Sequence, residues 1–326
     1  MPRIAHAEID SAAGCAAARK MRKTCNEKGP HAAGCLLALL AVSLALSQSG
    51  SSIAQSETIK QRNPAYGGIP RPDHVVIVLE ENKAYGQVIG NRAAQYINQL
   101  AKDGASFANS FAITHPSQPN YLALFSGSTH GIPDDRCPVS VSGDNLAREL
   151  GKKGLSFGIY SESMPLTGYQ GCRYGQYFRK HNPAVNWQNQ NVAPEANMPF
   201  DLFPRDYSKL PTVSIVVPDQ TDDMHDGAPL DAIARGDRWL RKNLDPYVQW
   251  AKKNNSLLIV TWDEDDDSSN NRIPTIFVGP MVKPGTYSVR IDHYGVLRTI
   301  VEMYGLTAIG HSAGAKPIVE VWKRSR

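Results

Sequence analysis

Acids, histidines and hydroxyls follow five apolar segments of this 326-residue chain, at the point where each segment stops. The segments are HVVIVLEEN (74–82), SFANSFAITHPS (106–117), TVSIVVPD (212–219), SLLIVTWDEDDD (256–267) and TYSVRIDHY (286–294). In open α/β sheets the carboxyl ends of the strands meet at one edge, and ligands bind there. The pattern therefore predicts that distant segments bring carboxylates, histidines and a serine to one catalytic site.

Ser117 is the candidate nucleophile of this site. In HPSQPNYLALFSG (115–127) it lies directly after an apolar segment and before a helical pattern. A helix N-terminus offers free N–H groups and a partial positive charge, which favour a phosphoryl group and an ionised hydroxyl. The alternative is that Ser117 only caps its helix. Asn120, three residues further along, is a candidate donor to a phosphoryl oxygen.

Two acidic pairs are candidates for activating the serine. Glu81 and Asn82 end one segment, and Asp263 and Glu264 end another. Acids at neighbouring strand ends repel one another, and oxygen ligands suit Ca²⁺, Mg²⁺ or Mn²⁺. A divalent cation held by these groups and by Ser117 would lower the pKa of the serine hydroxyl. The alternatives are a solvated strand end for Glu81 and an exposed acidic loop for DEDDD (263–267).

Three histidines follow apolar segments: His115, His225 and His293. They are candidates for binding phosphate oxygens or for protonating a leaving group. Alternatively, His225 and His293 join Asp223 in holding a second metal ion, since metal pairs clamp in-line phosphoryl transfer. His74, His130, His181 and His311 lack this placement.

The order of these motifs resembles a known family. The segments that carry the likeness are HVVIVLEEN, ITHPSQPNYLALFSG, VVPDQTDDMHDG, VTWDEDD and DHYGVLRTIVEMYGL. They are similar to the successive motifs of the bacterial and fungal phosphoesterase family, which contains secreted acid phosphatases and phospholipases C. The likeness runs from about Arg71 to Leu306, and HPSQPNY together with TWDE is specific to it.

The resemblance implies an alkaline-phosphatase-like fold and a role for each motif. Ser117 would form a phosphoseryl intermediate, and Asp223 would lie with the substrate. A metal ion would be held by Glu81, Asn82, Ser117, Asp263 and Glu264. The phosphate-binding or proton-transfer groups would be His115, Asn120, His225 and His293. Gly295 departs from the pattern, because the family is expected to have a serine after the His-Tyr pair.

The elements that position these residues alternate between strands and helices. Amphipathic stretches at 92–105, 144–154, 231–244 and 296–305 predict helices between the apolar strands. This alternation predicts an α/β fold with a mostly parallel central sheet, covered by helices on both faces. Residues 163–210 are rich in Asn, Gln, Pro and Tyr and predict an irregular cap. The catalytic domain is expected to span residues 72–326.

The amino-terminal region predicts export. Basic residues precede an apolar run at 32–47, so residues 1–54 are interpreted as a signal peptide, with Met21 as an alternative start. An uncleaved membrane anchor is the alternative, and residues 55–71 form a linker. Six of the 35 Lys and Arg and three of the 31 Asp and Glu lie in residues 1–54, which leaves 29 and 28 in the body. A body this close to neutral gives no reason to expect a nucleic-acid partner.

Two of the five cysteines, Cys137 and Cys172, lie beyond the signal peptide. An even pair in an exported protein predicts a disulfide between them. Secretion or a periplasmic location is therefore expected, with no membrane span after the signal is cleaved.

The combined prediction is an exported, metal-dependent phosphomonoesterase acting on a small phosphate ester. A phosphodiesterase of the phospholipase C type, acting on a phospholipid at the same site, is the first alternative. The compact chain favours the acid-phosphatase branch. A secreted metal-binding protein without turnover is the second alternative. A serine esterase is disfavoured because the chain has no Gly-x-Ser-x-Gly elbow.

Overall fold

A large mixed sheet forms the centre of the fold. The computed structural model describes residues 68–188 and 190–324. Within them, nine strands form this sheet and two form a separate hairpin. The strands are β1 (His74–Glu80), β2 (Ala105–Phe111), β3 (Phe157–Ser161), β4 (Arg173–Tyr174), β5 (Tyr177–Phe178), β6 (Asn197–Pro199), β7 (Val213–Val217), β8 (Ser256–Trp262), β9 (Arg272–Ile273), β10 (Thr275–Val278) and β11 (Gly285–Asp292).

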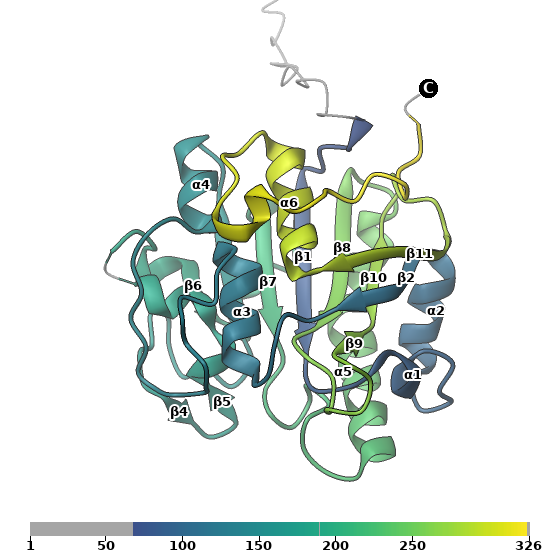
Figure 1. Cartoon of the computed structure of the whole chain (residues 1–326), viewed down its shortest axis with the longest axis horizontal. Helices are drawn as coiled ribbons and strands as arrows, with labels where there is room; N and C mark the ends of the chain where they lie inside the picture. The colour runs from purple at the N-terminus through teal and green to yellow at the C-terminus, as the bar shows by residue number, and fades with distance from the viewer. Residues whose placement is uncertain (1–67, 189, 325–326) are drawn as a thin grey trace, which may run out of the picture. The chain divides into compact units, whose positions relative to one another are not determined.

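The sheet order is β11-β2-β10-β8-β1-β7-β3-β6, with β9 paired to β2 (Figure 1). The central pairs β1/β7 and β1/β8 are parallel, as are β3/β7, β3/β6 and β11/β2. Strand β10 runs antiparallel to both of its neighbours. The predicted mostly parallel α/β sheet is therefore confirmed, with β10 and β9 as its antiparallel members.

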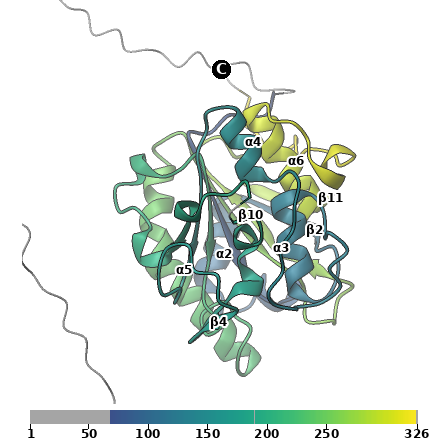
Figure 2. The same ribbon diagram turned by 90° about the vertical axis from the view of Figure 1, so that its left-hand side faces the viewer.

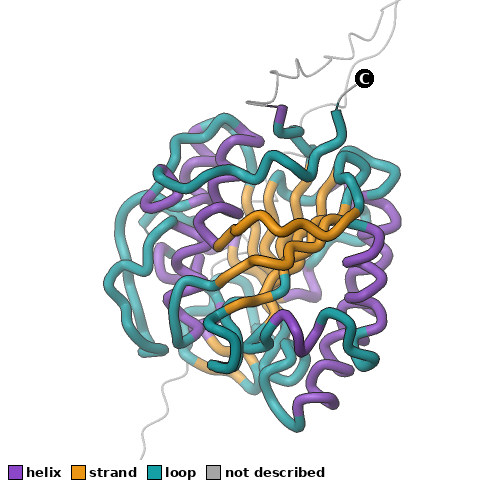
Figure 3. Tube along the Cα trace, turned by 45° about the vertical axis from the view of Figure 1, so that its right-hand side comes forward, coloured by secondary structure: helices purple, strands orange, loops and turns teal. Residues whose placement is uncertain are grey.

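Helices cover both faces of the sheet (Figure 2 and Figure 3). The apolar side chains of α3, α4 and α6 belong to the core on one face, and those of α2 and α5 belong to the core on the other. The helices are α1 (Tyr85–Val88), α2 (Gln95–Asp103), α3 (Ser117–Ser126), α4 (Leu146–Lys152), α5 (Pro229–Ala251) and α6 (His293–Tyr304). Each predicted helix is present, and α5 is longer than its apolar pattern indicated because the helix continues to Ala251.

Side-chain alternation along β1 decides which way the acids at its end point. Val75, Ile77 and Leu79 lie in the core beneath α3, whereas Val76 and Val78 lie in the core beneath α5. Because successive side chains of a strand point to opposite faces, Glu81 continues the α3 side. The phase of β1 thereby directs one acid toward the helix that begins at Ser117.

The expectation that the main strands are buried on both faces is wrong for β11. This strand lies at the edge of the sheet, and its side chains alternate between exposed and partly buried. Successive side chains point to opposite faces of the sheet, so this alternation shows that one face of β11 is left largely open to solvent. The central strands β1, β7 and β8 are buried almost throughout, as expected.

Residues 163–210 contain only short elements, as the composition indicated. They comprise the β4–β5 hairpin, β6 and the 3₁₀ turns η2 (Arg179–His181), η3 (Pro183–Trp187), η4 (Pro194–Ala196), η5 (Phe200–Leu202) and η6 (Tyr207–Lys209). A further 3₁₀ turn, η7 (Gly310–Ala313), follows α6. This irregular segment is ordered by side chains such as Asn182, whose amide donates to Asn197 Oδ1 at 2.6 Å.

The predicted signal peptide (1–54) and most of the predicted linker (55–71) lie outside the described residues. No helix in the described part of the chain is long and apolar enough to cross a membrane.

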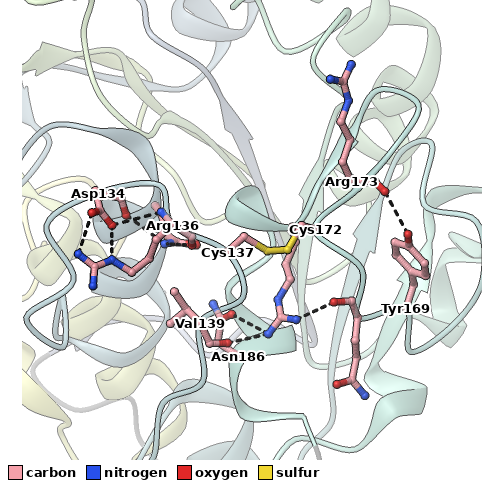
Figure 4. The surroundings of a disulfide bond; sticks show 11 residues. Asp134, Arg136, Cys137, Val139, Tyr169, Cys172, Arg173 and Asn186 are labelled. Carbon is pink, nitrogen blue, oxygen red and sulfur yellow. Dashed lines mark hydrogen bonds and ion pairs between the residues drawn. A yellow bond between two sulfur atoms is a disulfide. The ribbon is translucent and has the colours of Figure 1, made fainter.

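The predicted disulfide is confirmed. Cys137 and Cys172 are bonded, with their Cα atoms 5.8 Å apart (Figure 4). The bridge encloses α4 and β3, and the Arg179 guanidinium supports the same region by donating to Val139 O and Gln170 O, each at 2.6 Å.

Replacing both cysteines by alanine should lower the free energy of unfolding. Closing a loop of 35 residues removes chain entropy from the unfolded state, which corresponds to roughly 4 kcal/mol at most and commonly about 2 kcal/mol or more. Urea denaturation followed by circular dichroism measures the difference. Reductant should destabilise the wild type by a similar amount and leave the double variant unchanged. Equal unfolding midpoints for oxidised wild type and variant would show that the bridge contributes no stability.

Candidate active site

Ser117 is the first residue of α3 and is 1% exposed. Its hydroxyl lies 3.1 Å from Glu81 Oε2 and 3.1 Å from Glu264 Oε1. Both hydrogen-bond partners are carboxylates, so the serine is not a helix cap. One hydroxyl has one proton to donate, and two carboxylates compete for it. The arrangement suits a hydroxyl that is about to lose its proton.

Asn82 joins the ends of two strands. Its backbone has φ 41°, a left-handed conformation that asparagine tolerates better than most residues. This turn lets the Asn82 N–H donate to Asp263 Oδ1 at 3.2 Å, while its side-chain amide donates to Glu264 Oε1 at 2.8 Å. The ends of β1 and β8 are thereby held together, and the predicted acidic pairs do meet.

Glu81 has two further neighbours. The Tyr121 hydroxyl donates to Glu81 Oε1 at 2.6 Å, and His181 Nε2 lies 3.2 Å from the same oxygen. The rings of Tyr121 and His181 stack with centroids 5.3 Å apart. All three side chains are buried, so the position of the Glu81 carboxylate is closely constrained.

Burial of several acids at one edge shifts their ionisation. Burial, and then the Asp263 charge, raises the pKa of Glu264 to about 8. Burial also raises the pKa of Asp263 to about 6. The pKa of Glu81 and that of Asp223 lie well above the ordinary carboxylate range, again chiefly because of burial. Each ionised form is therefore disfavoured until a positive charge compensates it.

Five buried oxygens at this edge have no hydrogen-bond partner among the described residues. They are Asn82 Oδ1, Asp223 Oδ2, Asp263 Oδ2 and both carboxylate oxygens of Glu80. Leaving such acceptors unpaired is costly in the interior of a protein. Carboxylate and amide oxygens are ligands for hard divalent cations, so the donor set fits Ca²⁺, Mg²⁺ or Mn²⁺.

Among the described residues, two clusters bring three ligand atoms within 4.8 Å of one another. The buried one combines Glu81, His181 and Asp223. The Glu81 N–H donates to Asp223 O at 2.7 Å, which ties the end of β1 to the loop after β7. Asp223 thus lies beside Glu81 and Asn82, the pair at the end of β1.

Neither cluster contains His225 or His293, so the predicted grouping of these two with Asp223 is not observed. His225 is exposed, and its Nδ1 lies 2.8 Å from Oδ1 of the adjacent Asp226, in the loop after β7. His293 begins α6 and is 1% exposed, with its Nε2 2.8 Å from Asp263 O. His293 therefore supports the backbone of a site acid. Roles for either imidazole in binding phosphate remain predictions.

His115 lies at the mouth of the site. Its Nδ1 is 2.8 Å from Glu264 Oε2, and its Nε2 is 3.2 Å from Asp265 Oδ1. The side chain is 32% exposed, whereas Glu264 is almost fully buried. The chain of contacts from Ser117 through Glu264 to His115 connects the buried hydroxyl with solvent.

Asn120 is occupied by its own loop. Its side-chain oxygen accepts from Ile113 N at 2.9 Å and Thr114 N at 3.1 Å, and its amide donates to Thr114 O at 2.7 Å. The amide also lies 3.5 Å from Glu264 Oε2. These contacts shape the turn before Ser117, and donation to a phosphoryl oxygen remains a prediction.

Sequence reasoning missed His181 and Tyr121. His181 comes from the irregular segment 163–210 and follows only the two-residue strand β5, and Tyr121 falls within a helical apolar pattern. Lys180 was also missed. Burial lowers its pKa, but the Glu81 charge and the ion pair with Asp135 at 2.7 Å outweigh burial and raise it. The available signal for His181 was the HNP sequence in YGQYFRKHNP (174–183). The residue was missed because it lies in a long irregular insertion, where no apolar strand pattern indicates its position.

Comparisons with solved structures agree with this fold. A protein of the alkaline phosphatase superfamily from Vibrio parahaemolyticus matches with a TM-score of 0.54 and 16% identity, over 79% of this chain and 72% of that one. Lipoteichoic acid synthase LtaP from Listeria monocytogenes matches with a TM-score of 0.51 and 12% identity, over 75% of each chain. The alkaline-phosphatase-like fold expected from the sequence is confirmed.

Sequence relatives identify the family. A phosphatidylinositol-3-phosphatase of Mycobacterium tuberculosis is 46% identical over 88% of this chain and 93% of its own length. A phosphate-repressible acid phosphatase of Penicillium chrysogenum is 34% identical over 66% of this chain, which spans only 55% of the fungal protein. The model of the Phosphoesterase family matches residues 91–307. The chain therefore belongs to the Phosphoesterase family and is a hydrolase acting on phosphoester bonds.

Proposed function

We propose that the chain is a metal-dependent phosphomonoesterase in which Ser117 is the nucleophile. The observation that carries this proposal is the position of the Ser117 hydroxyl, 3.1 Å from each of the carboxylates of Glu81 and Glu264. Unpartnered buried oxygens of Asn82 and Asp263 at the same edge support a cation beside the serine. The partial positive charge at the start of α3 favours both a bound phosphoryl group and an ionised serine.

The residues that would hold the cation are those predicted from the sequence, Glu81, Asn82, Ser117, Asp263 and Glu264, joined by Asp223 and His181. A bound divalent cation would lower the pKa of the Ser117 hydroxyl and neutralise part of the carboxylate charge. The oxygen-rich set suits Ca²⁺, Mg²⁺ or Mn²⁺, and His181 adds one nitrogen ligand that Mn²⁺ tolerates well.

The reaction would proceed in two displacements. Ser117 Oγ attacks phosphorus and transfers its proton to Glu264, while the bond from phosphorus to the ester oxygen breaks. The alcohol leaves after accepting a proton from His115, whose Nδ1 lies 2.8 Å from Glu264 Oε2. Water then attacks the phosphoserine and gives a proton to His115. The bond from phosphorus to Oγ breaks, Oγ takes back the proton held by Glu264, and inorganic phosphate is released.

The proposed substrates are phosphomonoesters, including phosphorylated inositol lipids. Support comes from the relatives, since the mycobacterial protein is named a phosphatidylinositol-3-phosphatase and the fungal protein an acid phosphatase. The mycobacterial relative also spans nearly the same length as this chain.

Export is part of the proposal. The apolar run at 32–47 supports a cleaved signal peptide within residues 1–54, and the disulfide between Cys137 and Cys172 supports an oxidising compartment. The mature catalytic domain would then span residues 72–326 and act in the periplasm or outside the cell.

Substituting Ser117 by alanine should abolish hydrolysis of p-nitrophenyl phosphate, with kcat reduced by at least about 10³-fold, because no other hydroxyl replaces it between Glu81 and Glu264. Ser126→Ala, at the other end of α3, is the matched control and should keep full activity. Rapid acid quench and peptide mass spectrometry should find phosphate on Ser117 in the wild type. Full activity of Ser117→Ala would disprove the nucleophile.

The monoester preference predicts faster turnover of p-nitrophenyl phosphate than of its bis-ester or of phosphatidylcholine. Exhaustive chelation should remove activity, and Ca²⁺, Mg²⁺ or Mn²⁺ should restore it because the cation activates the serine. Initial rates on all three substrates test this. Preferred cleavage of phosphatidylcholine to a phosphorylated headgroup would assign the chain to the phospholipase C type instead.

The raised acid pKa values predict how stability depends on pH without metal. A carboxyl whose folded pKa exceeds its unfolded value stabilises the fold below the unfolded pKa, and this contribution is lost as pH rises through the folded pKa. For Asp263 and Glu264, with folded pKa values of about 6 and about 8, the loss extends from about pH 4 to about pH 8. The free energy of unfolding of chelated protein should therefore fall as pH rises across this window.

Glu264→Gln should reduce that slope, because the amide does not titrate, and a divalent cation should stabilise the wild type most at the alkaline end. Saturation at 100 times Kd corresponds to about 2.7 kcal/mol. Thermal unfolding at several pH values measures both effects, and Glu149→Gln, at a buried acid on α4, is the control. Identical slopes for wild type and Glu264→Gln, with no effect of cation, would contradict the charge cluster.

A further inference from the structure

A basic cavity lies along α5, on the face of the sheet opposite to α3. Its volume is about 740 Å³, and Arg235, Arg238, Arg241 and Lys242 contribute four cations to its lining. In Figure 2, α5 lies on the left of the sheet and α3 on the right. The side chains of α5 that face the sheet pack into the core of that side, so the cations occupy the outer side of the helix.

The spacing of these cations gathers them on one side of the helix. Arg235, Arg238 and Lys242 are separated by three and four residues, and Arg241 follows Arg238 by three. Residues three or four apart are neighbours on a helix surface, where like charges repel. The repulsion is an unfavourable feature of the empty cavity and is relieved when an anion binds.

The fold does not neutralise these cations. Within residues 68–188 and 190–324, none of the four has a carboxylate oxygen within the 4.0 Å of an ion pair. Arg235 instead donates to the backbone carbonyls of Thr221 (3.0 Å) and Asp226. Arg238, Arg241 and Lys242 are exposed.

Two acids of the same helix are already engaged, and a third, Asp231, lies exposed in its first turn, outside the lining of the cavity. Asp237 accepts from the backbone of α2, at Ile97 N (2.8 Å) and Tyr96 N (3.1 Å). Asp245 accepts from the Tyr96 hydroxyl at 3.1 Å and from the Gln249 amide at 2.8 Å. Asp222, at the rim, is the remaining acid of the lining, so cations outnumber acids by four to two.

Trp239 and a second cavity extend the site. Trp239 is 5% exposed, and its indole N–H donates to Glu162 Oε1 at 2.7 Å, which fixes the ring. A neighbouring cavity of about 480 Å³ shares Asp222, Trp239 and Lys242 with the first. It adds one cation, Arg205, and two acids, Glu162 and Asp201, so the excess of positive charge belongs to the first cavity.

We propose that this cavity is a second anion-binding site, for a ligand that carries several phosphate or sulfate groups. Guanidinium groups pair with such anions through two parallel hydrogen bonds, and three arginines converging on one hollow favour a multiply charged ligand over a single phosphate. The site lies on the opposite face from Ser117, and it does not depend on the function proposed for that residue.

The test compares two triple variants with wild type. Arg238→Gln, Arg241→Gln and Lys242→Gln together remove three exposed cations of the cavity. Lys153→Gln, Lys253→Gln and Lys316→Gln remove three exposed lysines elsewhere and serve as the matched control. The probe is inositol hexasulfate, which carries six anionic groups and no phosphoester bond, and its binding is measured by calorimetry.

We expect the cavity variant to weaken binding of inositol hexasulfate by at least about tenfold and the control to weaken it by less than about twofold. Both variants should keep wild-type turnover of p-nitrophenyl phosphate and wild-type unfolding temperatures. Vesicles containing phosphatidylinositol bisphosphate in phosphatidylcholine form the second arm. Loss of vesicle binding in the cavity variant would assign a lipid headgroup, and loss of hexasulfate binding alone would assign a soluble polyanion.

Equal binding of hexasulfate to wild type and the cavity variant would overturn the proposal. The proposal would also be overturned if inositol hexasulfate inhibited p-nitrophenyl phosphate hydrolysis competitively and equally in wild type and the cavity variant, because its binding site would then be at Ser117. Because turnover is measured separately, this failure is distinguishable from a failure of the proposed nucleophile.

Discussion

Burying several carboxylates at one edge of a sheet is unfavourable, and the rest of this structure is organised around that cost. Glu81, Asp223, Asp263 and Glu264 are all buried or nearly so. They meet because the carboxyl ends of β1, β7 and β8 lie side by side in a parallel arrangement. Burial raises the pKa of each acid, so binding of a positive charge at this edge is favourable.

Hydrogen bonds fix the orientation of the carboxylates at this edge. Asn82 donates to Glu264, and Tyr121 donates to Glu81, so neither carboxylate rotates freely. Among the described residues, the buried oxygens at this edge that remain without partners belong to Glu80, Asn82, Asp223 and Asp263. Ser117 lies between Glu81 and Glu264, so the hydrogen bonds that hold these carboxylates also position the proposed nucleophile and the proposed cation site. Such preorganisation is favourable for catalysis, because little rearrangement is needed when the substrate binds.

Charge is separated locally between the start of α3 and the outer side of α5. Buried Glu81 and Glu264 lie beside Ser117, whereas Arg238, Arg241 and Lys242 are exposed on α5. The body as a whole is nearly neutral, so this separation is local. It explains why net charge alone gave no indication of an anionic ligand.

Periodicity and strand-end chemistry made most of the fold predictable. The runs that became β1, β7 and β8 are apolar and buried, and the acids directly after them could be assigned to one edge from the topology of parallel sheets alone. The meeting of Glu81 with Ser117 follows from the same rule. The left-handed turn at Asn82, by contrast, leaves no periodic trace in the sequence.

What could not be predicted depends on segments without periodicity. His181 reaches Glu81 from an irregular insertion, where no rule relates sequence position to direction. His225 follows a strand as expected, but the loop after β7 turns it outward to Asp226. The His293 ring is buried against the Asp263 carbonyl at the start of α6. Composition does not specify to which side of a helix terminus a side chain turns.

The central claim is that the buried acids and Ser117 surround a divalent cation. Anomalous diffraction from crystals soaked in Mn²⁺ tests it most directly. We expect a peak at coordination distance from the unpartnered oxygens of Asn82 and Asp263, next to Ser117 Oγ. Full occupancy of Mn²⁺ elsewhere, with no peak at this edge of the sheet, would contradict the account.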